Sequence, residues 1–211
     1  MYGDQDWNTT SSLKKNPYYF SKTLAEKAAH EFVKTEAPAF SLVVINPFTV
    51  LGPALDTAAE PNTSVTKILL PLAGEQPTCL PLSEALVDVR DVAEMHVRGI
   101  EVEAAAGRRF LGVARSEGMS NREMCKIIKA AAPAPLKRRV PTVLVPPNFL
   151  VLLFARLTQP KGARDYIETN VGKFPRFDNS SAVDVLGVRF RDPADTVRDT
   201  VEWLVANKKV L

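Results

Sequence analysis

The chain has 211 residues, of which 45% are apolar and 24% are charged. This length corresponds to one domain or slightly more, and the composition is typical of a packed globular protein. A large multidomain assembly, a disordered chain and a collagen-like chain are therefore excluded. The 27 basic and 24 acidic residues leave a net charge of +3. This charge is too small and too scattered to indicate a nucleic-acid-binding surface.

The cysteines and the apolar stretches indicate the cellular compartment in which we expect the protein. Cys79 and Cys125 are far apart and match no zinc or redox motif, so we expect two small buried thiols in a reducing, cytoplasmic setting. No basic region precedes an apolar run at the N-terminus, so we expect no signal peptide. Residues 148–157 form the most apolar stretch, which is about half the length that crosses a bilayer. That stretch indicates a core or interface helix.

A helix followed by a buried strand is the first pattern along the chain. Asn16 and Pro17 predict a helix start with Asn16 as the capping side chain, and residues 18–34 are rich in helix formers. The apolar stripe expected on this helix consists of Phe20, Leu24, Ala28 and Val33. Residues 40–45 are apolar and mostly β-branched, which is typical of a strand buried on both faces of a parallel sheet.

The segment after this strand predicts a ligand-binding edge. We expect residues 48–51 to form a loop at the carboxyl end of the strand, where open α/β sheets bind ligands. Residues 54–87 contain several prolines and a helical pattern only over 64–72, so they predict an irregular insertion outside the sheet.

Helices and strands also alternate in the second half of the chain. A capping box of Ser120 and Glu123 and a cap-plus-proline start at residue 192 mark two of the helices. The elements expected here are a helix over 88–106, a strand over 110–114 and helices over 121–132 and from 192 onward. The alternation predicts an α/β fold. Two or three strands are too few for a doubly wound sheet, so we expect part of the sheet to be absent.

Tyr18 and Lys22 are the residues with the clearest chemical potential. They lie four residues apart at a helix start, so their side chains share one face. A neighbouring ammonium stabilises a phenolate, which lets a phenol act as acid or base toward a carbonyl or hydroxyl oxygen. The spacing also occurs by chance, in which case Tyr18 is a surface aromatic. The isolated His30 and His96 predict no metal site, and the dispersed glycines predict no cradle for a dinucleotide pyrophosphate.

Taken together, these motifs resemble the extended short-chain dehydrogenase/reductase family, in the NAD-dependent epimerase/dehydratase superfamily. The similarity is greatest to the branch of dihydroflavonol reductases, cinnamoyl-CoA reductases and fungal aldehyde or methylglyoxal reductases. The segments that carry the resemblance are residues 18–22 with 25–29, 46–53, 62–64, 88–93 with His96, and 177–181 ahead of Leu186 and Gly187.

The resemblance implies a fold and its division. The chain would be the C-terminal portion of a Rossmann-type doubly wound parallel sheet with a small mixed substrate-binding lobe. Residues 1–53 and 88–114 would be the Rossmann elements, and residues 54–87 and 115–211 would form mainly the substrate lobe and the C-terminal helices. The family's glycine-rich turn and a catalytic Ser or Thr would then lie upstream of residue 1.

The resemblance also implies a reaction and a site. Tyr18 would donate a proton to a substrate carbonyl, and Lys22 would hold the nicotinamide ribose. Pro47 and Val50 would line the nicotinamide pocket, and Ser64 would reach the cofactor from the start of a helix. The expected cofactor is NADP, with NAD possible. The expected substrate is a small carbonyl or alcohol compound, with no nucleic-acid partner and no membrane span.

Two alternatives remain beside an NAD(P)H-dependent carbonyl reductase. A sugar epimerase or a steroid dehydrogenase of the same fold would use the same Tyr18 and Lys22. A non-catalytic remnant or interaction module would keep the packing residues without holding cofactor. Because the cofactor cradle is not encoded in these 211 residues, we expect the isolated fragment to be inactive.

Overall fold

The computed structural model describes residues 1–58, 60–143 and 146–210. Its helices are α1 (Pro17–Glu36), α2 (Thr66–Ala73), α3 (Val89–Glu101), α4 (Asn121–Ala131), α5 (Ala134–Lys137), α6 (Asn148–Thr158), α7 (Lys161–Asn170), α8 (Ser180–Asp184) and α9 (Pro193–Ala206), with a short 3-10 helix η1 (Glu103–Ala105). Its strands are β1 (Val44–Pro47), β2 (Thr49–Leu51), β3 (Ser83–Glu84), β4 (Leu86–Asp88), β5 (Arg109–Gly112) and β6 (Met119–Ser120).

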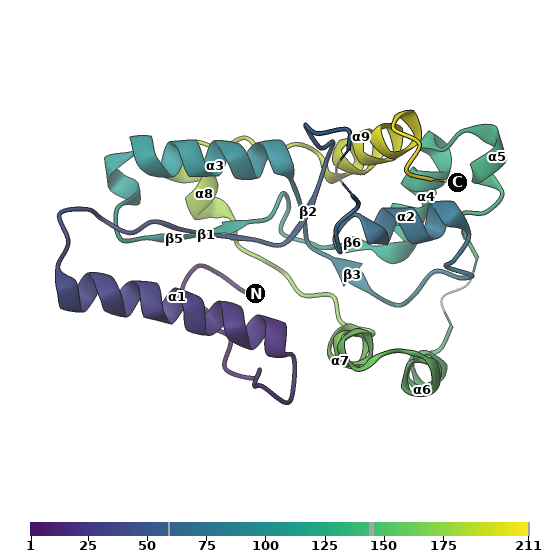
Figure 1. The fold of residues 1–211 in the computed structure, drawn as a ribbon, viewed down its shortest axis with the longest axis horizontal. Coiled ribbons are helices and arrows are strands. Elements are labelled where there is room, and N and C mark those ends of the chain that lie inside the picture. The colour runs from purple at the N-terminus through teal and green to yellow at the C-terminus, as the bar shows by residue number, and fades with distance from the viewer. Residues whose placement is uncertain (59, 144–145, 211) are drawn as a thin grey trace.

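The strands form three pairs, two of them parallel. β1 runs parallel to β5 with Val44 opposite Arg109, and β2 runs parallel to β4. β3 and β6 pair antiparallel. Figure 1 shows α3 above the β1–β5 pair and α1 below it. Parallel strands joined through helices confirm the predicted α/β class.

Two sequence predictions about the sheet are wrong. Residues 49–51, expected to be a loop, form strand β2, and the segment expected to be irregular, 54–87, contains most of its partner β4. Each strand has three residues, which is too short for a periodicity to show in the sequence. The first predicted strand, over 40–45, starts later, at Val44.

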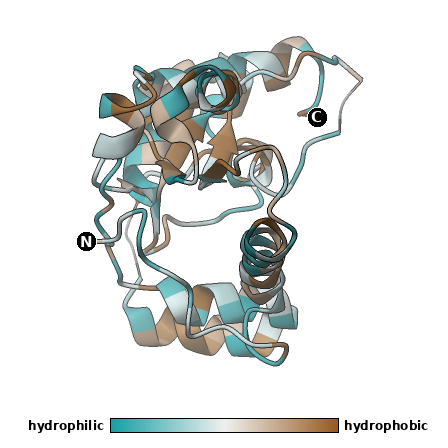
Figure 2. Cartoon of the chain, turned by 90° about the vertical axis from the view of Figure 1, so that its left-hand side faces the viewer, coloured by the Kyte–Doolittle hydropathy of each residue, from teal (hydrophilic) through white to brown (hydrophobic). Residues whose placement is uncertain are grey.

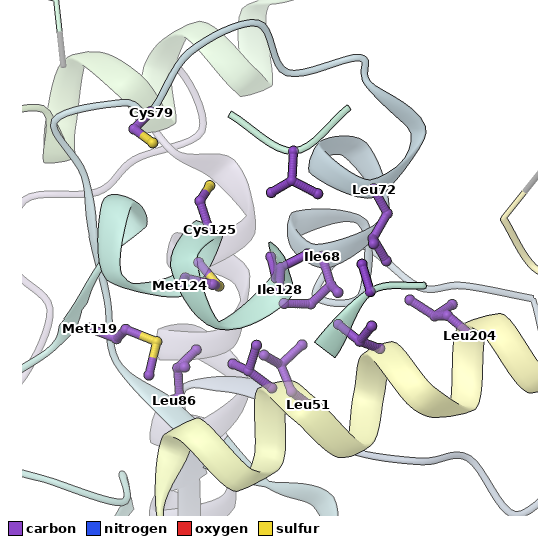
Figure 3. Packing of buried hydrophobic residues seen from close by; sticks show 14 residues of the cluster. Leu51, Ile68, Leu72, Cys79, Leu86, Met119, Met124, Cys125, Ile128 and Leu204 are labelled. Atoms are coloured by element: carbon purple, nitrogen blue, oxygen red, sulfur yellow. The ribbon is translucent and has the colours of Figure 1, made fainter. Parts of the chain in front are cut away.

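The larger hydrophobic core lies among α2, α4 and α9 (Figure 3). Its buried members include Leu51, Ile68, Leu72, Leu86, Met124, Ile128, Val201 and Leu204. Cys79 and Cys125 belong to the same core, which confirms the prediction of two buried free thiols. Burial, and secondarily the neighbouring Cys79, raises the pKa of the Cys125 thiol to about 12.

A smaller core lies around β5. Phe110 is fully buried there and packs with Met95 of α3 and Leu186, which follows α8. This core holds α3 and α8 against the β1–β5 pair. It thereby fixes the strand that leads into the proposed ligand edge.

Side-chain caps define three of the helix starts. Ser120 accepts a hydrogen bond from the Glu123 N–H at 3.1 Å, and Asp192 accepts one from the Ala194 N–H at 2.7 Å. Asp88 caps α3 by accepting from the Arg90 N–H. The predicted cap of α1 is wrong: Asn16 has a left-handed backbone, with φ of 54°, and its side chain donates to Thr169 instead.

Helix α1 differs from the other long helices. None of its twenty residues, all of which the structure describes, is buried. The predicted apolar stripe is therefore wrong as a core face, and Leu24 is 48% exposed. Figures 1 and 2 both show α1 lying along one side of the chain, apart from the main body of helices.

Helices α6 and α7 pack mainly against each other. Only Val151 and Ala155 of α6 are buried, so the stretch predicted as a core or interface helix has a mostly exposed apolar face. Among the described residues, no helix combines the length and the apolar character that crossing a membrane requires.

Candidate active site

Tyr18 and Lys22 lie side by side in the first two turns of α1. Pro17 occupies the first helical position, where its fixed φ suits the helix and its missing N–H costs no hydrogen bond. The Lys22 Nζ lies 5.6 Å from the centre of the Tyr18 ring. The structure therefore brings together the phenol and the ammonium that the spacing predicts.

This pair is open to solvent. Tyr18 is 65% exposed, and Lys22 is also exposed. The Tyr18 ring meets the edge of Tyr19 at 5.7 Å between ring centres, and this is its one described aromatic neighbour. A phenol in such a position can exchange protons with a bound molecule, but the described residues do not enclose it.

The other predicted site residues lie on neighbouring elements. Pro47 ends β1 opposite Gly112, Val50 lies in β2 opposite Val87, and Ser64 lies in the turn ahead of α2. Pro47 is exposed, whereas Val50 and Ser64 are half-buried. Within the described ranges, no hydrogen bond, ion pair or ring contact joins these three residues to Tyr18 or Lys22. Their role at the site stays a prediction.

A polar network that the sequence analysis missed lies near Tyr19. The buried Glu84 carboxylate accepts hydrogen bonds from Lys67 Nζ at 2.5 Å and from the Tyr166 hydroxyl at 2.5 Å. Thr49 donates to its second oxygen at 3.1 Å. Burial, followed by the charge of Glu84, raises the pKa of both Tyr19 and Tyr166. Both phenols therefore stay protonated, and the Tyr166 hydroxyl donates to Glu84.

This network left no signal in the sequence. Lys67 lies in the helical pattern over 64–72, and Glu84 lies in the part of 54–87 that predicts no regular structure. Tyr166 is 82 residues beyond Glu84 along the chain. Only the tertiary fold brings α2, β3 and α7 together. A buried carboxylate with a cationic partner and two hydroxyl donors is balanced in charge and well satisfied in hydrogen bonding.

Asp88 and Arg90 support the fold. The Asp88 side chain is fully buried, and Arg90 binds both Asp88, at 2.7 Å, and Asp199 of α9, at 2.6 Å. Burial alone would raise the pKa of Asp88, but hydrogen bonds from the Arg90 side chain and backbone hold it below its usual range. The ion pairs fix the start of α3 against α9.

A second set of polar contacts links α1 to the β1–β5 pair. Glu26 of α1 pairs with Arg109 at the start of β5 and accepts a hydrogen bond from Asn46 of β1 at 3.1 Å. The Arg109 guanidinium lies 4.0 Å from the Trp7 ring centre, which adds a cation–π contact. Polar side chains, rather than a buried apolar face, thus hold α1 in place.

The glycines test whether a dinucleotide would fit. Gly52, after β2, has a positive φ, but a Cβ there would lie 2.9 Å from the Val89 side chain, so its missing side chain serves close packing. None of the ten glycines, all of them described, forms an open cradle between a strand and a helix. The described glycines therefore offer no site for the pyrophosphate of such a cofactor.

Comparison with known proteins points to one group of enzymes, although no family model matches the sequence. The chain is 32% identical over 211 residues to the ketoreductase azaE of Aspergillus niger, a match that covers 95% of this chain and 54% of that protein. It is also 45% identical over 97 residues to cinnamoyl-CoA reductase 2 of Arabidopsis thaliana, covering 46% of this chain and 28% of that one.

Solved structures give the same result for the fold. Gre2 from Candida albicans is 29% identical, with a TM-score of 0.74 over 98% of this chain and 58% of its own. Yeast methylglyoxal/isovaleraldehyde reductase Gre2, solved in complex with NADPH, has a TM-score of 0.74 at 22% identity over 99% of this chain and 58% of its own. This second likeness establishes the fold alone.

The chain spans little more than half the length of these relatives. These similarities agree with the resemblance of the sequence motifs to the extended short-chain dehydrogenase/reductase family, in the branch of the cinnamoyl-CoA and methylglyoxal reductases.

Proposed function

We propose that this chain carries the proton-donating part of the active site of an NADP(H)-dependent carbonyl reductase acting on a small aldehyde or ketone. The observation that carries this proposal is the adjacency of Tyr18 and Lys22 at the start of a helix whose chain continues directly into strand β1. Support comes from relatives named as a ketoreductase and as a putative NADPH-dependent methylglyoxal reductase.

The roles follow from the side chains. Tyr18 donates its phenolic proton to the carbonyl oxygen, and the Lys22 ammonium 5.6 Å from the ring stabilises the phenolate that remains. Lys22 would also hold the nicotinamide ribose, Pro47 and Val50 would line the nicotinamide pocket, and Ser64 would reach the cofactor from the turn ahead of α2. A bound NADPH would supply the hydride. NADP is preferred to NAD because one relative is a putative NADPH-dependent methylglyoxal reductase and the similar yeast Gre2 was solved in complex with NADPH.

We further propose that the 211 residues alone do not complete a turnover. Tyr18 is exposed, and the described glycines offer no pyrophosphate cradle. These observations favour the alternative that the isolated chain is a non-catalytic domain, which keeps the family's packing but does not hold cofactor alone. A fluorescence titration of the purified chain with NADPH tests this alternative. Saturable binding at micromolar NADPH would contradict it, and absence of binding would support it.

A chimera tests the catalytic assignment. The chain is fused to the portion of the Aspergillus niger ketoreductase that lies outside the match, and NADPH oxidation is followed with a panel of aldehydes and ketones. Tyr18→Phe is expected to lower kcat by about 10²- to 10⁴-fold, because it removes the proton donor. NADPH binding is expected to stay unchanged.

Tyr19→Phe is the matched control, because it removes a neighbouring phenol that is hydrogen-bonded to neither Tyr18 nor Lys22 within the described structure. It is expected to keep kcat within a few-fold of the parent. If both variants lose activity equally, or if Tyr18→Phe keeps turnover, Tyr18 is not the proton donor.

A further inference from the structure

Helix α6 presents an uncovered apolar face. Val151 and Ala155, one turn apart, are the buried residues of this helix and define its inner side. The other side carries large apolar side chains that are 45–76% exposed. We name it the α6 face, consisting of Phe149, Leu150, Leu153, Phe154 and Leu157. At about 3.6 residues per turn, these residues occupy less than half of the helix circumference.

The rest of the described chain leaves the α6 face free. Helix α6 packs mainly against α7. Figure 1 shows the two helices side by side below the main body of the chain, with α6 on the outer side. Two cavities open on the described chain, and both are lined by residues outside α6. The α6 face is therefore a convex ridge, whereas an apolar peptide docks in a groove.

Basic residues lie at the C-terminal end of the α6 face. Arg156 is on α6 itself, and Lys161 begins α7. The Lys161 ammonium donates to the Lys14 carbonyl at 2.6 Å, so Lys14 and Lys15 also lie at this end. Both of these lysines are exposed, and no carboxylate of the described ranges pairs with either of them.

The N-terminal end of α6 is basic as well. A side chain on Gly172 would collide with the side chain of Asn148, the first residue of α6, so Gly172 lies against the start of the helix. The next residue, Lys173, is exposed. Among the residues that the structure describes, it has no carboxylate partner. Positive charge thus lies at both ends of the α6 face.

Acidic residues do not balance this charge. Helix α6 has none, and α7 has two, Asp165 and Glu168. Asp165 pairs with Lys161 at 2.9 Å, and Glu168 pairs with Arg156 at 2.9 Å. The three lysines at the ends of α6 are left without a counter-charge on either helix.

An apolar ridge with lysines at its ends matches an anionic lipid surface. When a helix lies flat on a membrane, its large apolar side chains enter the boundary between headgroups and acyl chains, and nearby basic side chains meet the anionic headgroups. The 11 residues of α6 are too few to span a bilayer. A second copy of this chain is a poorer occupant, because a two-fold contact through the α6 face would bring the lysines of both copies together.

We propose that the α6 face docks on an anionic lipid bilayer, with α6 parallel to the membrane plane and the lysines at its ends on the headgroups. The docking uses none of the residues assigned to the reduction. It can therefore fail while the catalytic assignment of Tyr18 stands, and the reverse also holds.

Sedimentation with vesicles tests the docking. The purified full chain is mixed with vesicles of equal parts phosphatidylcholine and phosphatidylglycerol, and separately with vesicles of phosphatidylcholine alone. The chain is expected to bind the anionic vesicles about tenfold more tightly or better, and added salt should weaken this binding because it screens the lysines. Absence of binding, or equal binding to both compositions, overturns the proposal.

Two leucine variants localise the contact. Leu153→Glu places a carboxylate in the α6 face and is expected to weaken binding to the anionic vesicles about tenfold or more. Leu24→Glu makes the same change on α1, where Leu24 is 48% exposed against 53% for Leu153, and is expected to leave binding unchanged. Circular dichroism checks that both variants are folded. An equal loss in both variants, or no loss in Leu153→Glu, overturns the assignment to α6.

A lysine variant and a lipid-free measurement complete the test. Lys173→Gln is expected to weaken binding about fivefold, whereas Lys126→Gln at an exposed position of α4 should change it less than about twofold. Equal effects of the two variants contradict the proposed orientation. Without lipid, light scattering is expected to give one mass for the unmodified chain and for Leu153→Glu. A dimer that Leu153→Glu dissociates would assign the α6 face to a second copy and overturn the proposal.

Discussion

The core among α2, α4 and α9 and the helix α1 contain similar types of residue but differ in burial. Both regions combine strong helix formers with apolar residues at helical spacing. Ile128 and Leu204 in the core are fully buried, whereas no residue of α1 is. Helix formation is thus local, but burial depends on what lies opposite. Paired substitutions in the core and in α1 test this difference in burial.

Truncating a core side chain has the largest expected effect. Ile128→Ala removes buried methyl groups and leaves a cavity among α2, α4 and α9, which costs about 2–5 kcal/mol of unfolding free energy. Phe32→Ala on α1 removes a larger but exposed side chain and is expected to change stability by about 0.5 kcal/mol or less. Urea unfolding measures both. A similar loss in both variants would show that α1 is packed in solution.

Breaking the buried ion pair comes next. Arg90→Met leaves the Asp88 carboxylate buried without its cation, which costs about 2–4 kcal/mol, since removing one partner of a buried pair is strongly destabilising. Lys34→Met breaks the exposed Lys34–Glu31 pair of α1 and is expected to cost well under about 1 kcal/mol. Comparable losses would contradict the difference in burial.

The same pair predicts a pH dependence. The pKa of Asp88 is lower in the folded chain than in the unfolded one, so its ion pair stabilises the folded state fully above about pH 4, the usual Asp value. That contribution falls as the pH drops through the lower, folded value. The stability difference between the parent and Arg90→Met should therefore shrink in acid. A constant difference from pH 7 to pH 2 would exclude this linkage.

Helix capping gives the smallest effect. Ser120→Ala removes the oxygen that accepts from the Glu123 N–H and is expected to cost about 1 kcal/mol. Ser21→Ala on α1 removes a hydroxyl whose one hydrogen bond within the described residues goes to the Tyr18 carbonyl on an exposed turn, and it is expected to be neutral or slightly stabilising. Thermal unfolding by circular dichroism resolves the pair. A destabilising Ser21→Ala would reveal an additional role for that hydroxyl.

Sequence reasoning succeeded where the signal is local. The caps at Ser120 and Asp192 are one-turn interactions, and both helices begin where the sequence predicts. It failed at Asn16, because the Asn16 side chain donates a hydrogen bond to Thr169 of α7 instead of capping α1. It also failed at β2 and β4, where pairing across 37 residues defines strands too short to show a pattern.

The candidate site divides in the same way. Tyr18 and Lys22 are neighbours because of helix geometry alone, so their adjacency could be predicted. The tertiary fold brings together three separate elements that carry Glu84, Lys67 and Tyr166, and no spacing in the sequence predicts their contact. The exposure of α1 was not predicted either, although the apolar residues of α1 are less confined to one face than those of the packed helices α3 and α4.

The two thiols of the main core provide a built-in reporter of its opening. Alkylating reagents react with thiolates, and a pKa of about 12 keeps Cys125 protonated at neutral pH while Cys79 lies beside it with no exposed surface. Modification must therefore await transient separation of α4 from its neighbours. The labelling rate of the unmodified chain would count those separations directly, without any engineered probe.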